Sequence, residues 1–419
     1  MRTRSIRANS ALALAGDAAS KASALLVVVI GARFLDVAQF AALATGLAVA
    51  GVLTATLDLG AGTLLTRDGA TSRAARGSLF TASLRARLPL FGLVVVVSPL
   101  VGLPLGSPLG ALSVAALAVS GALALSVVGL YRSSRDIRPE ALQRLAAGML
   151  AVAATTVAVA VAPRADIVLL ALAATTLVGI APLLLRAPAI ADLSGRLSPF
   201  TTLRRAAPIG LLALATIAYY RSGTIVLAAF SDARATAAFG VASGIAFGLL
   251  MLPNAITTAL LPRLAVERDL DGLVACTRRT LAWTVLLAVG LAGASAVVVP
   301  AALPVALGPQ YAEAGAPFAV LCLGIPFIAA SGVIGTALLT LGRLRVLGAQ
   351  VGVSLAVNLA ALLALVPTTG AVGAAAATVA CETVGLVILL HAARSALPGL
   401  LVRAAFAAGR MEDPETALP

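Results

Sequence analysis

Charged and aromatic residues are scarce in this sequence, and their scarcity decides the class of protein. Of the 419 residues only 11% are charged and 4% are aromatic, whereas 60% are hydrophobic. Soluble domains average roughly a quarter charged residues, and a soluble core cannot hold so large a share of apolar side chains. The composition therefore excludes a water-soluble fold and predicts a protein whose surface is mostly covered by lipid.

Residues that bind metals or act in covalent catalysis are few and scattered. The three cysteines, Cys276, Cys322 and Cys381, form no CxxC pair, and the single histidine, His391, sits at the end of the last apolar run. This pattern supports neither a disulfide framework nor a zinc site, and it argues against a Ser-His-Asp triad. We therefore expect a protein that is not an enzyme and that needs no metal or organic cofactor.

The net charge of +13 would on its own suggest a nucleic-acid-binding protein. The basic residues, however, lie in short gaps between apolar runs and form neither a continuous basic face nor an aromatic stacking platform. Such charges are typical of membrane topology signals that also contact anionic lipid headgroups. We expect membrane lipids, and no nucleic acid, as partners.

About twelve apolar runs are long enough to cross a membrane as helices of ~20 residues. They cover residues 11–33, 38–65, 88–106, 108–131, 142–162, 165–186, 207–230, 236–261, 280–307, 313–341, 345–366 and 370–392. The first run has only five apolar residues before Gly16 and Asp17, too few for the ~7–15-residue core of a signal peptide. The sequence thus predicts an all-α, multi-pass membrane protein whose first helix is not cleaved.

Arginine is distributed unequally between alternate gaps, which predicts the orientation of the chain. If the N-terminus is cytoplasmic, the outer gaps hold only Arg33, Arg164 and Arg234, and most other basic residues, Arg85 and Arg87 among them, fall in inner gaps. One missed helix would move every later gap to the other side and destroy this asymmetry. We therefore expect both termini to be cytoplasmic.

The two halves of the chain repeat. Residues 34–67 align without gaps to 230–263 at an offset of 196, which matches Phe34, Asp36 and Asp58 to Phe230, Asp232 and Asn254. An even number of helices between the repeats keeps them in the same orientation, as in transporters whose two bundles are related by an axis along the membrane normal. We interpret Asp58 and Asn254 as residues that cap or brace helix contacts.

This repeat predicts four segments. Two pseudo-symmetric six-helix bundles would surround a central cavity, joined by a cytoplasmic linker and followed by a disordered cytoplasmic tail. The bundles are residues 1–186 and 207–393, the linker is 187–206 and the tail is 394–419.

Several ionisable residues lie within the apolar runs, where each costs at least ~2.5–3.5 kcal/mol and therefore needs a reason. Asp17 and Lys21 are four residues apart on the first helix and can pair. Arg221 lies midway along the seventh helix, the counterpart of the first helix in the repeat, with Tyr220 beside it. Glu382 lies in the last helix.

Two interpretations of these residues stay open. In the first, Lys21, Arg221 and Tyr220, with Asp17 nearby, line a cavity between the bundles and bind an anionic solute. In the second, Asp17 and Lys21 form a neutralised pair that only fixes the first helix against its neighbours. Glu382 is either a charge partner of Arg221 or a group that carries protons. For Arg221, which has no acidic residue one turn away, we favour the cavity.

The sequence resembles one known family. The segments GARFLDVAQFAAL and TLDLGAGTLLTRDGA, together with residues 237–265, 302–327 and 367–390, resemble bacterial polysaccharide exporters and lipid-linked oligosaccharide flippases. These proteins belong to the multidrug/oligosaccharidyl-lipid/polysaccharide (MOP) exporter superfamily. The resemblance covers nearly the whole chain in the right order.

The resemblance implies a two-bundle transporter that works by alternating access in the bacterial cytoplasmic membrane. Flippases of this family move polyprenyl-diphosphate-linked oligosaccharides from the inner to the outer leaflet, and cationic residues on helices 1 and 7 are thought to engage the diphosphate. Lys21 and Arg221 stand at positions that would inherit this role. The implied partners are an anionic lipid-linked substrate and the polysaccharide polymerase or glycosyltransferases of the same pathway.

Two alternatives to a flippase stay open. A cation-coupled multidrug or metabolite extruder of the same superfamily would favour acidic residues in the cavity, whereas the cation Arg221 favours an anionic substrate. A membrane-embedded transferase acting on lipid-linked sugars would need acids, histidines or a large loop at the membrane surface, and the outer loops here are short.

Overall fold

The computed structural model describes residues 2–400, except 102–106, 135–137, 195–196, 267–268 and 399. Of residues 2–15, 17, 99–101, 258–259, 261–263 and 265–266 it describes only the backbone. The side chain of Asp17 and most of the predicted tail, residues 401–419, therefore lie outside the described residues. The described part is almost entirely helical and contains no strand.

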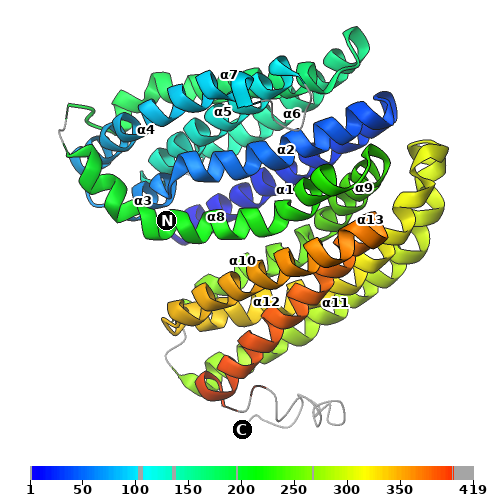
Figure 1. The fold of residues 1–419 in the computed structure, drawn as a ribbon. Coiled ribbons are helices and arrows are strands. Elements are labelled where there is room, and N and C mark those ends of the chain that lie inside the picture. The colour runs from blue at the N-terminus through cyan, green and yellow to red at the C-terminus, as the bar shows by residue number, and fades with distance from the viewer. Residues whose placement is uncertain are drawn as a thin grey trace.

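The N-terminal bundle is built from the first seven helices (Figure 1). They are α1 (Arg2–Phe34), α2 (Val37–Asp58), α3 (Ala61–Asp68), α4 (Arg73–Val101), α5 (Pro108–Ser133), α6 (Arg138–Val161) and α7 (Ala165–Ile190). Helix α3 follows α2 after a break at Leu59 and Gly60, both with positive φ, so the two helices together form one membrane crossing. Helix α1 packs on α6, and α5 packs on α2 and α7.

The remaining helices form the second bundle (Figure 1). They are α8 (Pro199–Phe230), α9 (Ala233–Leu249), α10 (Met251–Val266), α11 (Leu270–Ala306), the 3₁₀ helix η1 (Pro309–Ala314), α12 (Gly315–Thr340) and α13 (Leu344–Ala396). Gly370, at φ 54° and ψ −129°, divides α13 into two crossings. Ten helices of the described part are long and apolar enough to span a membrane. The prediction of an all-α protein with about twelve membrane helices in two bundles is confirmed.

Several helices are longer than the apolar runs that predicted them. Helix α4 begins at Arg73 and α11 at Leu270, each at least ten residues before its run, because backbone hydrogen bonds can continue where polar side chains leave the hydrocarbon. The predicted linker is likewise partly helical, since α7 ends at Ile190 and α8 begins at Pro199. Arg87 was assigned to an inner gap, and this was wrong: the residue is 0% exposed inside the N-terminal bundle.

The predicted repeat is visible at the helix ends. Helix α1 ends at Phe34 and α8 ends at Phe230, residues that the alignment pairs. After each, an aspartate caps the next helix: Asp36 and Asp232 accept a hydrogen bond from the backbone N–H three residues later, at 2.7 Å in both cases. Because an N-cap satisfies a donor that the helix cannot, both bundles start their second helix in the same way.

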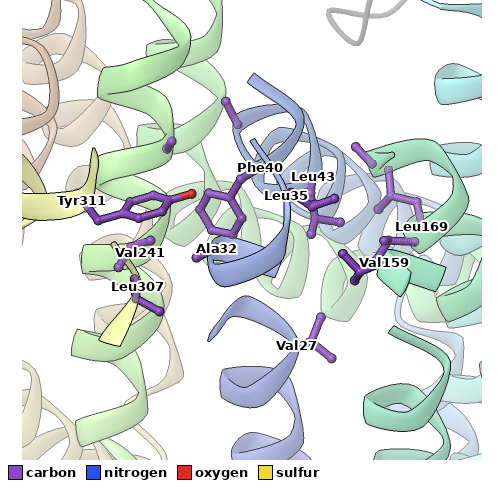
Figure 2. Packing of buried hydrophobic residues seen from close by; sticks show 14 of the residues in the cluster. Val27, Ala32, Leu35, Phe40, Leu43, Val159, Leu169, Val241, Leu307 and Tyr311 are labelled. Atoms are coloured by element: carbon purple, nitrogen blue, oxygen red, sulfur yellow. The ribbon is translucent and has the colours of Figure 1, made fainter. Parts of the chain in front are cut away.

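The two bundles share one apolar core at the end of the molecule where α1 meets α2, here called the far end. At its centre the ring of Tyr311 from η1 lies edge-on to Phe40 of α2, with centroids 5.8 Å apart (Figure 2). Val241 of α9 and Leu43 of α2 belong to the same cluster (Figure 2). At the opposite, near end, where α1 begins, the largest apolar clusters separate mainly by bundle.

Three glycines of α9 bring the bundles into close contact below this core. A methyl group placed on Gly240 would lie 3.0 Å from the Ala44 side chain of α2. On Gly244 and Gly248 it would lie 3.1 Å and 3.5 Å from side chains of α1. Small residues at four-residue spacing allow membrane helices to approach closely. The far end is therefore closed by packing between the two bundles.

Helix α8 starts on the N-terminal bundle although it belongs to the second. The backbones of Gly60 and Gly210 are so close that a methyl group on either would lie within 2.9 Å of the backbone around the other. Nearby, Arg205 of α8 pairs with Asp68 of α3 at 2.6 Å. The hydrogen bond from Arg67 holds the pKa of Asp68 below its ordinary value, with Arg205 adding to the effect. Helix α8 is thus attached to both bundles.

Candidate functional site between the bundles

Helix α8 presents different residues to its two neighbours, α2 and α13. Arg221 lies against α2: its Nε is 3.4 Å from a methyl group built on Gly51. Tyr219 and Ser222 lie against α13, where their main-chain and side-chain oxygens meet Asn358. Successive helical residues point about 100° apart, so Arg221 faces the N-terminal bundle while Tyr219 and Ser222 face α13.

Arg221 is a cation without an acidic partner in the described part of the chain. The residue is solvent-exposed, and no hydrogen bond or ion pair of its guanidinium is present among the described residues. Because residue 51 is a glycine, the side chain of Arg221 has room to lie against α2 at this point. An ionisable group at membrane depth that is neither paired nor covered is a functional-site hypothesis by default.

Lys21 is also exposed, and it lies on the face of α1 turned toward the second bundle. Leu25, one turn further along, contacts Gly248 of α9, and Val28 contacts Gly244. Residues 21, 25 and 28 share one side of a helix, whereas Ser23 faces Gly148 of α6 on another side. Lys21 therefore lies on the same side of α1 as the residues that contact α9, one turn closer to the near end.

Arg221 and Lys21 both lie between the far end and the near end, at levels that differ by roughly 8 Å along the helices. Helices α2 and α9 both start at the far end, and Ala44 is level with Gly240. Seven residues further, about 10 Å toward the near end, come Gly51, which contacts Arg221, and Phe247. Lys21 is one turn, roughly 6 Å, beyond the Leu25–Gly248 contact on α1. Each bundle thus carries one of these two cations within the helical part of the molecule, and Lys21 lies nearer the near end than Arg221.

Three aromatic rings contact one another at the level of Arg221. Tyr219 and Tyr220 have ring centroids 4.7 Å apart, and Tyr220 and Phe247 have centroids 5.6 Å apart with planes at 82°. Edge-to-face geometry of this kind is the favoured arrangement of aromatic pairs. The sequence analysis did not select Phe247. Aromatic residues make up only 4% of this chain, so an aromatic residue within an apolar run could have been noted as a candidate.

Glu382 lies in a polar network inside the second bundle. The hydroxyl of Tyr219 donates a hydrogen bond to its Oε1, while Asn358 Nδ2 donates to Ser222 Oγ at 2.7 Å and the Cys381 thiol lies 3.3 Å from the Tyr219 hydroxyl. Glu382 is 5% exposed and forms no ion pair among the described residues. The structure therefore brings Glu382 to Tyr219 and does not bring it to Arg221.

Asp58 has a bracing role, as predicted, but with a partner that the sequence did not reveal. Its Oδ1 accepts from Gly62 N at 3.2 Å and pairs with Arg87 Nη1 at 3.2 Å. Arg87 also donates to Ser126 Oγ at 2.7 Å and lies 5.7 Å from the Phe91 ring. This buried pair joins α2, α4 and α5 and is separate from the residues around Arg221.

A small cavity lies elsewhere, at the far end of the N-terminal bundle. It holds about 270 Å³ and is lined by Gln39, Ala42, Ser107, Gly110, Arg164, Ala165, Asp166 and Leu169. None of the predicted site residues lines it. Among the described residues no group of three His, Cys, Asp or Glu side chains could hold a metal ion.

Comparison with known sequences places the chain in a family. Residues 6–266, more than half of the chain, match the family described as polysaccharide biosynthesis protein. The chain belongs to this family. No curated protein sequence matches it.

Solved structures show that this chain has the fold of MOP-superfamily transporters. The lipid II flippase MurJ in its inward closed conformation aligns with a TM-score of 0.70 at 12% identity, covering 94% of this chain and 92% of MurJ. A multidrug resistance MATE family transporter of the MOP superfamily in its inward-facing conformation aligns with a TM-score of 0.70 at 12% identity, covering 92% and 96%. The MATE multidrug transporter DinF-BH aligns with a TM-score of 0.68 at 14% identity, covering 95% and 97%.

Proposed function

We propose that this protein is a flippase of the bacterial cytoplasmic membrane and not an enzyme. It moves a polyprenyl-diphosphate-linked oligosaccharide, or a related cell-surface polysaccharide precursor, from the inner to the outer leaflet by alternating access. Its near end faces the cytoplasm, and both termini are expected on that side. The polymerase or glycosyltransferases of the same pathway are its expected protein partners.

Arg221 carries this proposal. It is exposed between the bundles, at mid-depth, without an acidic partner among the described residues. A diphosphate needs cations when it leaves water, and an arginine fork matches phosphate oxygens well. Lys21 supplies a second cation roughly 8 Å nearer the near end, with Asp17 on the same helix four residues away. The polyprenyl tail needs no polar site and stays in the lipid.

The closed far end supports an order of events. The diphosphate and its sugars enter from the near end, where the bundles have largely separate cores, and meet Arg221. The bundles then separate at the Phe40–Tyr311 contact and close at the near end, which releases the sugars to the other leaflet. A substrate drives this change only as far as it binds one state better than the other.

Glu382 is the proposed coupling group. A buried carboxyl in the membrane that accepts a hydrogen bond from one tyrosine and has no ionic partner among the described residues can exchange a proton during the cycle. Its partner Tyr219 precedes Tyr220 and Arg221 on α8. Protonation of Glu382 would therefore change the hydrogen bond of a residue close to the proposed substrate site.

A cation-coupled multidrug or metabolite extruder is the second candidate. One observation favours it: the acid Glu382 lies behind a cluster of three aromatic rings, a combination that suits aromatic cations. The exposed charge of Arg221, on the same helix as two of these rings, is nevertheless positive, and therefore we rank the flippase first.

The deciding experiment is mass spectrometry of polyprenyl-diphosphate-linked oligosaccharides from a deletion strain complemented with variants. With Arg221→Gln, one completed lipid-linked glycan should accumulate and its surface polymer should be lost, as in the deletion strain. Arg33→Gln serves as the matched control, because Arg33 is an exposed arginine at the end of α1. It should restore export.

Other outcomes would change the assignment. Near-normal export by a well-expressed Arg221→Gln protein would remove Arg221 from the site. An unchanged lipid pool with intact surface polymer in the deletion strain would contradict the flippase function. If that strain also became sensitive to cationic dyes, the extruder would take first place.

A further inference from the structure

Tyr220 differs from the other three tyrosines of the chain. The hydroxyl of Tyr131 donates to the carbonyl oxygen of Leu183 at 2.9 Å, and that of Tyr219 donates to Glu382. The hydroxyl of Tyr311 has no partner among the described residues either, but it is buried in the far-end core, where no ligand reaches it. Tyr220 is 36% exposed, and its hydroxyl has no hydrogen-bond partner among the described residues. Buried tyrosine hydroxyls usually find a partner, so an exposed one without a partner is free to bind a ligand.

The pair of Tyr220 and Phe247 lies between the bundles and not at the lipid interface. Phe34 and Phe230, both exposed, stand at helix ends, where interfacial aromatic belts lie. Trp283 is 63% exposed on α11, a helix that packs mainly on its neighbours within the second bundle. Tyr220 instead belongs to α8, which packs on α2, and Phe247 belongs to α9, which packs on both α1 and α2.

We propose that Tyr220 and Phe247 form a sugar-binding subsite for the residue attached directly to the diphosphate. This inference rests on the proposed flippase function. The sugar nearest the lipid is bonded to the diphosphate, and Phe247, on which Tyr220 packs, is level with Gly51, which contacts Arg221. A group that holds the diphosphate at Arg221 therefore places this first sugar within reach of the two rings.

The chemistry of the pair fits a sugar. The C–H face of a pyranose is apolar and slightly positive, and it packs on the negative face of an aromatic ring. The free hydroxyl of Tyr220 can exchange hydrogen bonds with the sugar hydroxyls. The edge-to-face contact with Phe247 and the ring of Tyr219, held by Glu382, fix the Tyr220 ring and reduce the entropy lost on binding.

The test compares two probes on the purified full-length protein in lipid nanodiscs. Undecaprenyl diphosphate carries the diphosphate alone, and undecaprenyl-diphosphoryl-N-acetylglucosamine carries one sugar. Their dissociation constants are measured by native mass spectrometry for the wild type and for Phe247→Leu, Tyr220→Leu, Tyr220→Phe and Arg221→Gln. Phe230→Leu is the control, because it removes an exposed ring from the end of α8.

The two leucine variants should bind the sugar-bearing probe roughly three- to tenfold more weakly and the bare diphosphate unchanged. This unchanged binding shows that they are folded. Tyr220→Phe should keep most of the sugar binding, because the ring remains, and Arg221→Gln should weaken both probes. Equal effects of the leucine variants on both probes, or no effect on either, would overturn the subsite. Failure of the wild type to bind either probe would instead remove the flippase function on which it rests.

Discussion

Gly51 leaves space for Arg221, and this makes a prediction at the scale of single residues. A methyl group at position 51 would lie 3.4 Å from Arg221 Nε, an ordinary contact, and 4.0 Å from Ile217. Gly51→Ala should therefore transport almost normally. The larger side chain of Gly51→Leu should push the guanidinium away and lower transport about as much as Arg221→Gln. Export at the wild-type level by a stable Gly51→Leu protein would show that the position of Arg221 over α2 is unimportant.

The buried pair of Asp58 and Arg87 makes a second prediction. Asp58→Asn leaves the Arg87 charge without its partner inside the bundle, which should destabilise the protein by roughly 3–5 kcal/mol. The double variant Asp58→Asn, Arg87→Met removes both charges and should recover most of the loss. Thermal unfolding in detergent measures both effects.

The exposed pair Arg234–Glu313 provides the matched control. Its side chains are 59% and 61% exposed and 3.2 Å apart. Glu313→Gln should therefore cost less than about 1 kcal/mol. If Asp58→Asn were equally mild, the Asp58–Arg87 pair would not be a brace.

Some residues of the candidate site could be selected from the sequence, because most residues around them are apolar and face lipid or the helix core. An ionisable residue in a long apolar run is conspicuous, so Arg221 and Glu382 could be selected without a structure. Arg87 could not, because it stands one residue before an apolar run and looks like a loop charge. The partners could not be predicted either. Whether Glu382 faces Arg221 or Tyr219 depends on the rotation of two helices about their axes, which composition does not record.

At the scale of elements, apolar runs predicted the number of helices better than their ends. Hydropathy reports where lipid lies, whereas a helix continues as long as its backbone hydrogen bonds do, so α4 and α11 extend well past their runs. Repeated capping residues were more informative. Asp36 and Asp232 mark the start of α2 and α9 because a cap is a local interaction.

The break in α13 at Gly370 leads to a prediction about the stability of this element. It separates the two crossings of α13 at φ 54° and ψ −129°, a conformation that an L side chain adopts only with strain. Gly370→Ala should lower the stability by about 1–3 kcal/mol. The control Gly348→Ala changes a helical glycine of the same α13 with open space around it and should be neutral or stabilising. Thermal unfolding in detergent compares the two; equal melting temperatures would contradict the proposed strain.

At the scale of the whole molecule, the two repeated bundles meet at the closed far end, and the nature of this contact decides whether they can move against each other. Two similar bundles can rock against each other only if the contact between them is separable. The far-end contact consists of apolar side chains and three glycines of α9, with no ion pair across it among the described residues. Such a contact can open without leaving a buried charge unpaired.

A cross-link tests whether this contact must open. The methyl positions of Ala44 and Gly240 are 3.0 Å apart, so cysteines there need only a small adjustment to reach the usual Cβ–Cβ distance of roughly 3.5–4.5 Å in a disulfide. We expect oxidation of Ala44→Cys, Gly240→Cys to join the two bundles and to stop flipping in proteoliposomes, and a reductant to restore it. Each single variant, which keeps the three natural cysteines, should flip normally under oxidation.

The cross-link itself is measured by placing a protease site in the segment between α7 and α8. After cleavage the halves should stay together on a gel without reductant and separate with it. Because helix α8 packs against the N-terminal bundle, a hinge there could allow the near end to move while the far end stays joined. Transport by the fully cross-linked protein would therefore show that the sugars leave without separation of Ala44 from Gly240, and alternating access by rocking of the two bundles would have to be abandoned.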